Sequence, residues 1–444
     1  MRLLCVLVLA ATSVSAAQQG SAARPSADSH PGAVAPTFNK DVLPIFQRRC
    51  QVCHRPGEIG QMPLITYAGS RPWAKAIKAA VLARKMPPWF ADPKYGDFRD
   101  VRILTEKEIH TISAWVDAGA PEGDAKDKPK PLPWPEGWNI RADEIFQMTE
   151  PYAIPAAQAL AYVYIVIPTG FLHDTWVTAA EIRPGNRSVV HHALAVIRPP
   201  GSTWMKEAKP FEPYIPPANS TEAGAQAIPD AKNPDADPSA FDYELLTAYA
   251  PGAQAERFDG DHSAKLIPAG SDIVLQMHYT PAGKKVMPDQ TRLAMELAAE
   301  PPQKRFMSAV MNNANWVIPP GDPNYEGHGR LTFGEPVELV FLQPHMHFRG
   351  KDMTVRLVYP ASKDGPGKTE TILSVPHYDF NWQTIYYLKE PLHLPAGTKV
   401  EVTAHWDNSA NNPANPDPTK TVRWGDQSWD EMLSLPMGVI IDRY

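Results

Sequence analysis

Cysteine is scarce in this chain of 444 residues, which contains only three. Cys5 lies in an N-terminal segment that we expect to be removed on export, so the mature protein keeps only Cys50 and Cys53. A secreted protein of this size with two cysteines is not built on a disulfide framework. The two remaining cysteines therefore need a joint explanation.

Positive charge is also in short supply. The chain has 43 Lys and Arg against 49 Asp and Glu, which gives a formal net charge of -6 at pH 7. Without a basic field, the protein has no electrostatic means of holding nucleic acid or an anionic membrane surface. We therefore expect no nucleic-acid partner.

The N-terminal apolar run, residues 3–11, is too short to span a bilayer. Arg2 precedes this run and Val14-Ser15-Ala16 follows it, a pattern typical of a secretory signal peptide. We expect residues 1–16 to be the signal peptide and residues 17–36, which are small and polar, to be a disordered lead-in. An uncleaved anchor is the alternative. The prediction is a secreted or periplasmic protein without stable membrane insertion.

The remaining composition is that of a globular protein, with 43% hydrophobic and 21% charged residues. The length indicates two to four domains. Proline, with 48 residues against 27 glycines, favours loop-rich β structure over helical bundles.

Cys50-Gln51-Val52-Cys53-His54 has the C-x-x-C-H spacing of covalent c-type heme attachment. Two thiols add to the two heme vinyl groups, and the next residue, His54, is placed to ligate iron. The alternative is a thiol pair beside a chance histidine. A sixth iron ligand should be Met or His further along the chain. We prefer Met86, in a loop fixed by two prolines, over Met62, which lies very close to the attachment motif.

Three predicted helices surround this motif, over residues 38–50, over residues 72–84 and after Thr105. Glu108 completes a capping box with Thr105, and Gly119 ends the third helix. Residues 37–124 resemble a class I cytochrome c domain, which implies a small all-α fold with one covalent heme c. Residues 125–144 are rich in proline and predict a semi-rigid linker.

From residue 145 onward the pattern changes to short apolar runs between turn residues, which predicts β-sandwiches. About 300 residues exceed one sandwich, so we divide this region into 145–302 and 303–444. Residues 198–270 are poorly periodic and predict a long excursion over the surface. The strand-like runs are 162–167, 175–177, 188–190, 273–275, 337–342, 354–359, 385–388 and 399–404.

Histidines occur in or beside several of these runs. His191 and His192 follow the run 188–190, and adjacent strand residues bind one metal only at a bulge or a strand end. Otherwise one imidazole is buried and the other exposed. His278 lies on a later run, where a single histidine is often simply packed.

His345 and His347 are two residues apart, so on a strand both point to the same face, which is the beginning of a metal site. Met432, in Asp430-Glu431-Met432, is either a further ligand or a core residue. We interpret His377 and His405, on or near strands, as structural or supporting residues.

A histidine pair, a single histidine, H-x-H and D-E-M, in this order, resemble the copper type II, ascorbate-dependent monooxygenases. That family includes the peptidylglycine α-hydroxylating and dopamine β-monooxygenases. The resemblance covers about residues 150–444 and implies two all-β jelly-roll-like domains with one copper each. It implies an electron-transfer site of His191, His192 and His278, and a catalytic, oxygen-binding site of His345, His347 and Met432.

The ligand types agree with this interpretation, because imidazole suits copper and a thioether selects Cu(I). The histidines are not accompanied by an H-E-x-x-H motif, which disfavours a zinc hydrolase. The chain departs from the animal enzymes, which are rich in disulfides and have no heme domain.

We therefore expect a secreted copper-dependent monooxygenase with two coppers and one heme c. It would hydroxylate a C–H bond of a small organic or peptide-like substrate with O2, using electrons from an external donor that pass through the heme. The alternatives are a non-catalytic heme and copper electron-transfer or copper-binding protein, and an oxidase that releases peroxide.

Overall fold

The computed structural model describes residues 35–442 except 61, 135–136, 157–159, 218–242, 251, 281–285, 362–364 and 426. The expected signal peptide, Cys5 and all but the end of the lead-in lie outside the described residues. Residues 36–444 form one compact unit. Within the described part of the chain, no helix is long and apolar enough to cross a membrane.

The N-terminal part of this unit is helical, as expected, and packs around Phe38, Phe46, Ile112 and Trp115, which are all buried. Thr105 Oγ1 accepts a hydrogen bond from the Glu108 amide at 3.2 Å, and the Glu108 carboxylate accepts one from the Thr105 amide at 2.8 Å. The predicted capping box is therefore confirmed. The elements are η1 (Phe38–Val42), α1 (Leu43–Arg49), α2 (Tyr67–Ser70), η2 (Arg71–Trp73), α3 (Ala74–Leu82), α4 (Glu106–Asp117) and η3 (Ala125–Asp127).

The loop between α3 and α4 connects the helices to the β structure. Ala91 and Phe98 from this loop pack into the core of the second sandwich, and Phe98 forms an antiparallel bridge with Leu388. The linker also has contacts, because the Gln47 side chain donates to the Lys130 carbonyl at 2.8 Å. The helical segment is thus tied to the β structure by more than the linker.

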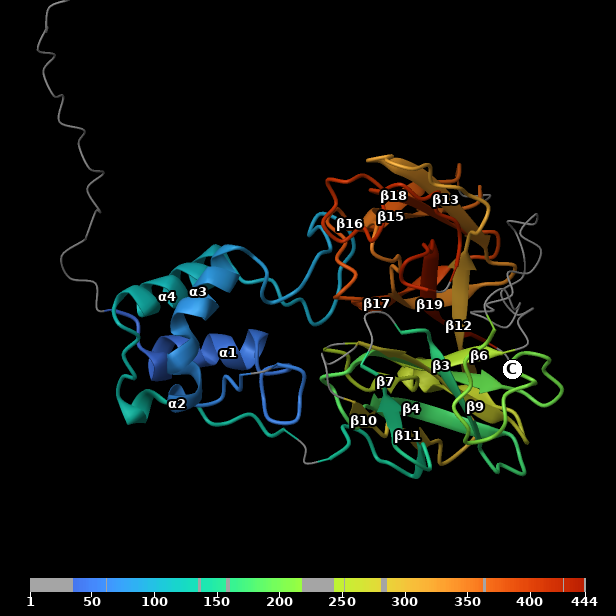
Figure 1. Cartoon of the computed structure of the whole chain (residues 1–444), viewed down its shortest axis with the longest axis horizontal. Helices are drawn as coiled ribbons and strands as arrows, with labels where there is room; N and C mark the ends of the chain where they lie inside the picture. Colours follow the sequence, from blue (N-terminus) through green and yellow to red (C-terminus); the bar gives the residue numbers. More distant parts are fainter. Residues whose placement is uncertain are drawn as a thin grey trace, which may run out of the picture. The chain divides into compact units, whose positions relative to one another are not determined.

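The first sandwich packs the four-stranded sheet β3-β9-β5-β6 against the strands β1, β11, β4 and β8 (Figure 1). Its core contains Val177, Leu246, Ile273 and Leu275, none of which is accessible to solvent. The strands are β1 (Glu144–Gln147), β2 (Tyr152–Ile154), β3 (Val163–Pro168), β4 (Thr175–Arg183), β5 (Val190–Arg198), β6 (Glu244–Tyr249), β7 (Glu256–Arg257), β8 (Ser263–Ile267), β9 (Asp272–Tyr279), β10 (Met287–Asp289) and β11 (Arg292–Leu297).

The second sandwich packs the sheet β13-β18-β15-β16 against β12, β19, β14 and β17. Leu339, Met353, Val355 and Trp406 are fully buried between these layers. The strands are β12 (Lys304–Asn312), β13 (Tyr325–Thr332), β14 (Val337–Leu342), β15 (Gly350–Val358), β16 (Thr369–Val375), β17 (Tyr386–Leu394), β18 (Lys399–Trp406) and β19 (Ser434–Ile441). The expected β-rich body with two sandwiches is confirmed.

One sheet runs through both sandwiches, because β8 pairs in parallel with β12 at Ser263 and Ala264. The prediction of an irregular excursion over 198–270 was wrong in part, since β6, β7 and β8 lie there. These strands are short and two of them are buried on successive residues, so they lack the alternation that marks a half-exposed strand.

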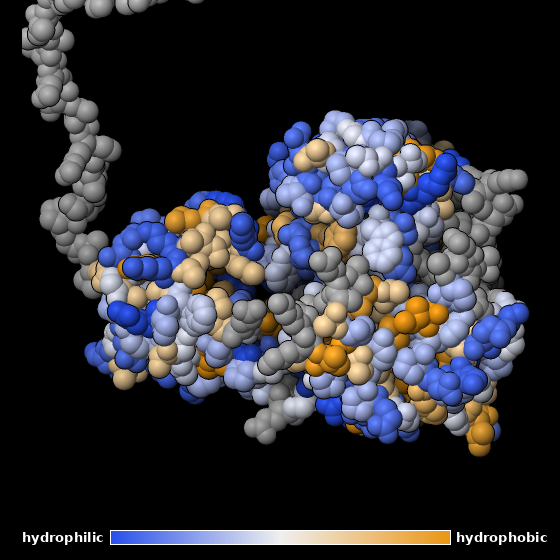
Figure 2. Space-filling model, viewed as in Figure 1, coloured by the Kyte–Doolittle hydropathy of each residue, from blue (hydrophilic) through white to orange (hydrophobic). Residues whose placement is uncertain are grey.

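Exposed apolar side chains gather mainly on the first sandwich. Figure 2 shows several orange patches there, whereas the outer sheet of the second sandwich is mostly polar on this face. Leu172 and Val286 are among the exposed apolar residues of the first sandwich.

A buried cation stabilises the junction of the two sandwiches. Lys265 Nζ donates to the carbonyls of Leu245 and Leu246, both at 2.7 Å, and to Ser308 Oγ at 2.8 Å. Glu256, which is also buried, exerts an electrostatic attraction on it. Strands β6, β8 and β12 are therefore connected by one ammonium group.

We predict that Lys265→Met lowers the free energy of unfolding by about 3 kcal/mol, because it leaves buried oxygen acceptors unpaired and Glu256 without its partner. Lys368→Met is the matched control, since the Lys368–Glu370 ion pair is exposed and should contribute little to stability. Chemical denaturation followed by tryptophan fluorescence measures both. Equal losses in the two variants would contradict the assigned role of Lys265.

Candidate metal sites

The first histidine group depends on a bulge in β5. Val190 pairs with Tyr279 and His192 pairs with His278, so His191 is an extra residue at a shift of register. The sequence had suggested that the pair follows the end of a strand over 188–190. In the structure the pair lies near the start of β5. The bulge, the condition under which both histidines bind one ion, is present.

The three imidazoles lie close together. One ligand atom from each of His191, His192 and His278 falls within 4.8 Å of the others, and His192 Nε2 is 3.0 Å from His278 Nδ1. Three nitrogens this close could hold one metal ion, which needs each of them at about 2 Å. His191 Nδ1 is buried and has no hydrogen-bond partner among the described residues. Tyr162, whose ring lies edge-on to His278 at 4.8 Å, covers the group.

The second group follows β14, which ends at Leu342. Met346 points into the core of the second sandwich, while the rings of His345 and His347 lie 5.2 Å apart. His345 Nδ1 is 2.9 Å from Gln383 Oε1, so this nitrogen carries the proton and Nε2 is available to a metal.

His347 is fully buried, and neither ring nitrogen has a hydrogen-bond partner of good geometry among the described residues. Burial lowers the pKa of His347, and nearby backbone groups of Asp430 and Gln427 oppose this fall. Buried imidazole nitrogens without partners are costly. Coordination of a metal ion would remove that cost.

Glu431 connects the H-x-H turn to the segment that carries Met432. Its buried carboxylate accepts hydrogen bonds from the amides of His347 at 2.8 Å and Arg349 at 2.6 Å, and from Trp406 Nε1 at 3.0 Å. Burial raises the pKa of Glu431 to about 7, although these donors oppose the rise. Our sequence analysis quoted Glu431 only as part of a motif and missed this role.

The two groups meet at one cavity of about 80 Å³, which we call the metal chamber. His192, His345 and Met432 all line it. Phe380 lies beside both groups, stacked on His191 at 5.0 Å and edge-on to His347 at 5.9 Å. The structure thus clusters His191, His192 and His278, pairs His345 with His347, and places Met432 at the same cavity as His192 and His345.

The electrostatics of the chamber keep the imidazoles neutral. Burial lowers the pKa of His191 and His345 to about 4 and that of His278 to about 3, and it lowers the pKa values of His192 and His347 well below the usual range. The residues that line the chamber in the described chain include no carboxylate. Neutral imidazoles with one thioether suit copper and not Mg²⁺ or Ca²⁺, which prefer oxygen ligands.

A larger cavity of about 410 Å³, here called the cysteine cavity, lies among the helices and is lined by Cys50, Cys53, His54 and Met86. Both cysteines are free thiols, and burial raises the pKa of Cys50 to about 12. Trp382, from the second sandwich, forms part of the wall. The volume is in the range of small-molecule and cofactor sites.

The geometry around His54 involves the backbone of Met62. His54 Nδ1 lies 3.1 Å from the carbonyl oxygen of Met62, so Nδ1 donates and Nε2 keeps its lone pair. A Cβ on Gly60 would approach His54 Nδ1 to 2.6 Å, so only glycine fits there. Met62 and Met86 both line the cysteine cavity, so the preference for Met86 stays a prediction.

The two histidines interpreted as structural lie outside the metal chamber. His377 is exposed. His405 pairs with Asp352 at 2.7 Å and Glu326 at 3.1 Å, and although burial acts to lower its pKa, these carboxylates raise it. Sequence reasoning missed Phe380, Trp382 and Gln383, since the motif around His377 drew attention to the histidine itself.

Comparisons with known proteins add little. Neither a protein-family model nor a curated protein matches this chain. Solved viral structures match over much of it: the T13 particle of infectious bursal disease virus (9% identity, 69% of this chain and 72% of that chain, TM-score 0.18), the VP2 subviral particle of the same virus (8%, 70% and 78%, 0.17) and the Sputnik virophage (11%, 70% and 89%, 0.18). These TM-scores are too low to support any argument about fold or function.

We predict that the metal-free protein loses stability as the pH falls. The folded-state pKa values of His191 and His278, about 4 and about 3, lie below the ordinary 6.5, so the unfolded chain binds protons first. The stability that comes from keeping these imidazoles neutral is fully present above pH 6.5. It is lost as the pH falls toward the folded-state pKa values. Between pH 7 and pH 5 the free energy of unfolding should fall by about 2 kcal/mol for each of the two histidines.

Denaturation of the metal-free protein at pH 7, 6 and 5 tests this dependence. The double variant His191→Gln/His278→Gln should show a shallower loss of stability than the parent protein, and His377→Gln should match the parent. Parallel curves for the parent and the double variant would show that these imidazoles are not buried in the neutral form.

Proposed function

We propose that this protein is a secreted or periplasmic copper-dependent monooxygenase with a covalently bound c-type heme. Its reaction would be the hydroxylation of a C–H bond in an organic substrate. The observation that supports this proposal most strongly is that three clustered imidazoles and the H-x-H pair meet at one chamber, which His192, His345 and Met432 line. The family resemblance of these residues in sequence assigns them to two copper sites.

In this proposal His191, His192 and His278 hold one copper, and His345, His347 and Met432 hold the other. The copper beside Met432 supplies O2 binding and activation. The Gln383 carbonyl oxygen accepts from His345 Nδ1 and so directs Nε2 into the chamber. Glu431 fixes the backbone on both sides of His347. The protein thereby presents its ligands in one protonation state and one orientation.

The cysteine cavity fits a c-type heme. It places two thiols and a histidine with a free Nε2 on one apolar wall, and Met86 also lines it. Such a group would act as a one-electron carrier, which suits copper ions that are reduced singly.

A single segment of the second sandwich touches all three proposed redox sites. Trp382 lines the cysteine cavity, Phe380 stacks on His191, and Gln383 bonds to His345. One electron leaving a ferrous heme would give ferric heme and convert Cu(II) to Cu(I). We assign Trp382 and Phe380 as the residues that connect donor and acceptor in this transfer.

The function is tested by O2 consumption in the presence of a reductant. We expect uptake that depends on substrate, and a product containing one oxygen atom from labelled O2. Uptake with peroxide release and no oxygenated product would indicate an oxidase. Reduction of copper without O2 uptake would indicate an electron-transfer protein.

We predict two coppers per chain in chemically different sites. His192→Ala should empty one site and His345→Ala the other, each halving the copper content measured by elemental analysis, while His377→Ala should leave it unchanged. Met432→Leu should weaken Cu(I) binding more than Cu(II) binding, because the soft thioether favours the reduced ion. Loss of the same ion in both alanine variants would refute two separate sites.

We also predict one heme that stays with the protein after acid–acetone extraction, and that Trp382→Leu slows heme oxidation at least tenfold when the reduced protein is mixed with O2 and substrate. Trp73→Leu is the matched control, since Trp73 is 45% exposed in the helical segment. The heme absorption spectrum should be the same in both variants. An unchanged rate in Trp382→Leu would remove this residue from the transfer.

A further inference from the structure

The metal chamber has little free space for a substrate, and a second cavity of about 190 Å³ adjoins it. Leu194, Leu245 and Val310 line both cavities. On β5, Ala193, Ala195 and Ile197 point into the first core, so His192, Leu194 and Val196 point to the opposite face, along which the two cavities lie. His192 and Val196 are four residues apart, or about 13 Å along an extended strand.

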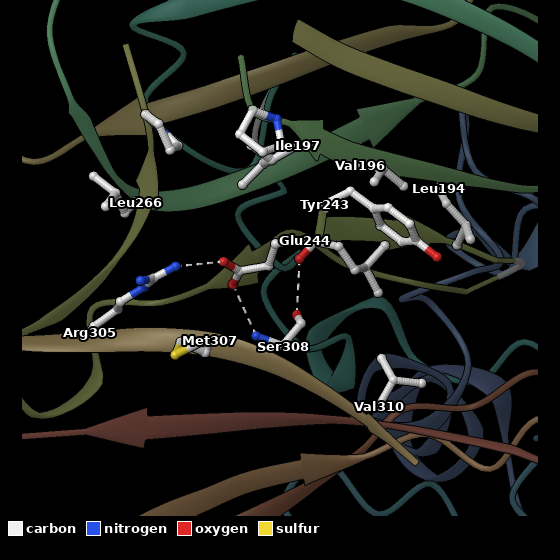
Figure 3. A pocket seen from close by; sticks show the side chains of 13 residues that line it. Leu194, Val196, Ile197, Tyr243, Glu244, Leu266, Arg305, Met307, Ser308 and Val310 are labelled. Carbon is white, nitrogen blue, oxygen red and sulfur yellow. Dashed lines mark hydrogen bonds and ion pairs between the residues drawn. The ribbon is translucent and has the colours of Figure 1, made fainter. Parts of the chain in front are cut away.

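The walls of the second cavity come from both sandwiches. Val196 on β5, Leu266 on β8 and Met307 on β12 surround it, together with the three shared residues (Figure 3). We call the two adjoining cavities together the apolar groove. A strongly polar ligand, such as a sugar or a nucleotide, would leave most of its hydrogen-bonding groups unpaired against these side chains. An extended hydrocarbon chain fits them.

The far end of the groove carries one polar cluster. Arg305 donates to the Glu244 carboxylate at 3.0 Å, and the Ser308 amide donates to the same carboxylate at 3.1 Å, as Figure 3 shows. Arg305 Nε is buried and has no hydrogen-bond partner among the described residues. Glu244 is therefore occupied by donors, while Arg305 retains an N–H group for an acceptor. A carboxylate is the acceptor that a guanidinium prefers.

We propose that the apolar groove is the substrate site and that it takes an aliphatic chain with a terminal carboxylate. The carboxylate would bind at Arg305, the chain would lie along Leu194, Val196 and Met307, and the other end would enter the metal chamber. The claim that this ligand is a substrate rests on the proposed function. The binding itself depends only on the groove.

Titration calorimetry with decanoate tests the site on the copper- and heme-loaded protein without reductant, where no turnover occurs. Decanoate should bind with a dissociation constant below about 1 mM. Val310→Phe, which adds bulk at a residue that lines both cavities, should weaken binding at least tenfold. Val286→Phe, at an exposed valine of the first sandwich that lines neither cavity, is the matched control and should bind as the parent does.

Arg305→Gln separates the two ends of the ligand. It should weaken decanoate binding about tenfold and leave the binding of 1-decanol, which has no carboxylate, within twofold of the parent. Equal losses for both ligands would overturn the role of Arg305. Failure of decanoate to bind the parent, or unchanged binding in Val310→Phe, would overturn the site.

The outcomes distinguish this site from the proposed function. Binding of decanoate without any oxygenated product on reduction would leave the groove as a ligand site and refute the monooxygenase. Oxygenation of another substrate that is unaffected by Val310→Phe would support the monooxygenase and refute the groove as its substrate site.

Discussion

Hydrogen bonding to the buried carboxylate of Glu431 is the interaction on which the arrangement of the H-x-H turn and Met432 depends. This carboxylate accepts four hydrogen bonds, from the amides of His347, Arg349 and Met432 and from the Trp406 indole. These bonds tie the loop after β14, the end of β18 and the segment before β19 to one point. Since Met432 follows Glu431 directly, the same anchor places the thioether beside the imidazoles. Burial raises the pKa of this carboxyl to about 7, and the hydrogen bonds from the His347 and Arg349 amides limit the rise.

Placing the ligands has a cost in stability. Five imidazoles lie in or around the chamber in their neutral form, and several of their nitrogens lack partners among the described residues. Each unsatisfied buried group costs about 1–3 kcal/mol. Elsewhere the fold compensates with well-packed cores and with the Lys265 junction between the sandwiches. Buried polar groups without partners, gathered at one place in an otherwise regular fold, are typical of a functional site.

Local features could be predicted from the sequence and long-range ones could not. The capping box at Thr105 follows from residue types over four positions, whereas the bulge at His191 was only one of two conditions named for a shared metal and is seen in the structure alone. The convergence of both histidine groups depends on the parallel junction of β8 and β12, for which no local pattern exists. The role of the Phe380–Gln383 segment depends on three contacts with distant parts of the chain, which periodicity cannot predict.

The most direct test of this account is a crystal structure of the loaded protein with anomalous diffraction measured at the copper and iron absorption edges. The account predicts two copper peaks, one among His191, His192 and His278 and one among His345, His347 and Met432. It also predicts one iron peak between His54 and Met86. A single copper peak shared by all five histidines, or an empty cysteine cavity in protein exported and matured with heme available, would contradict it.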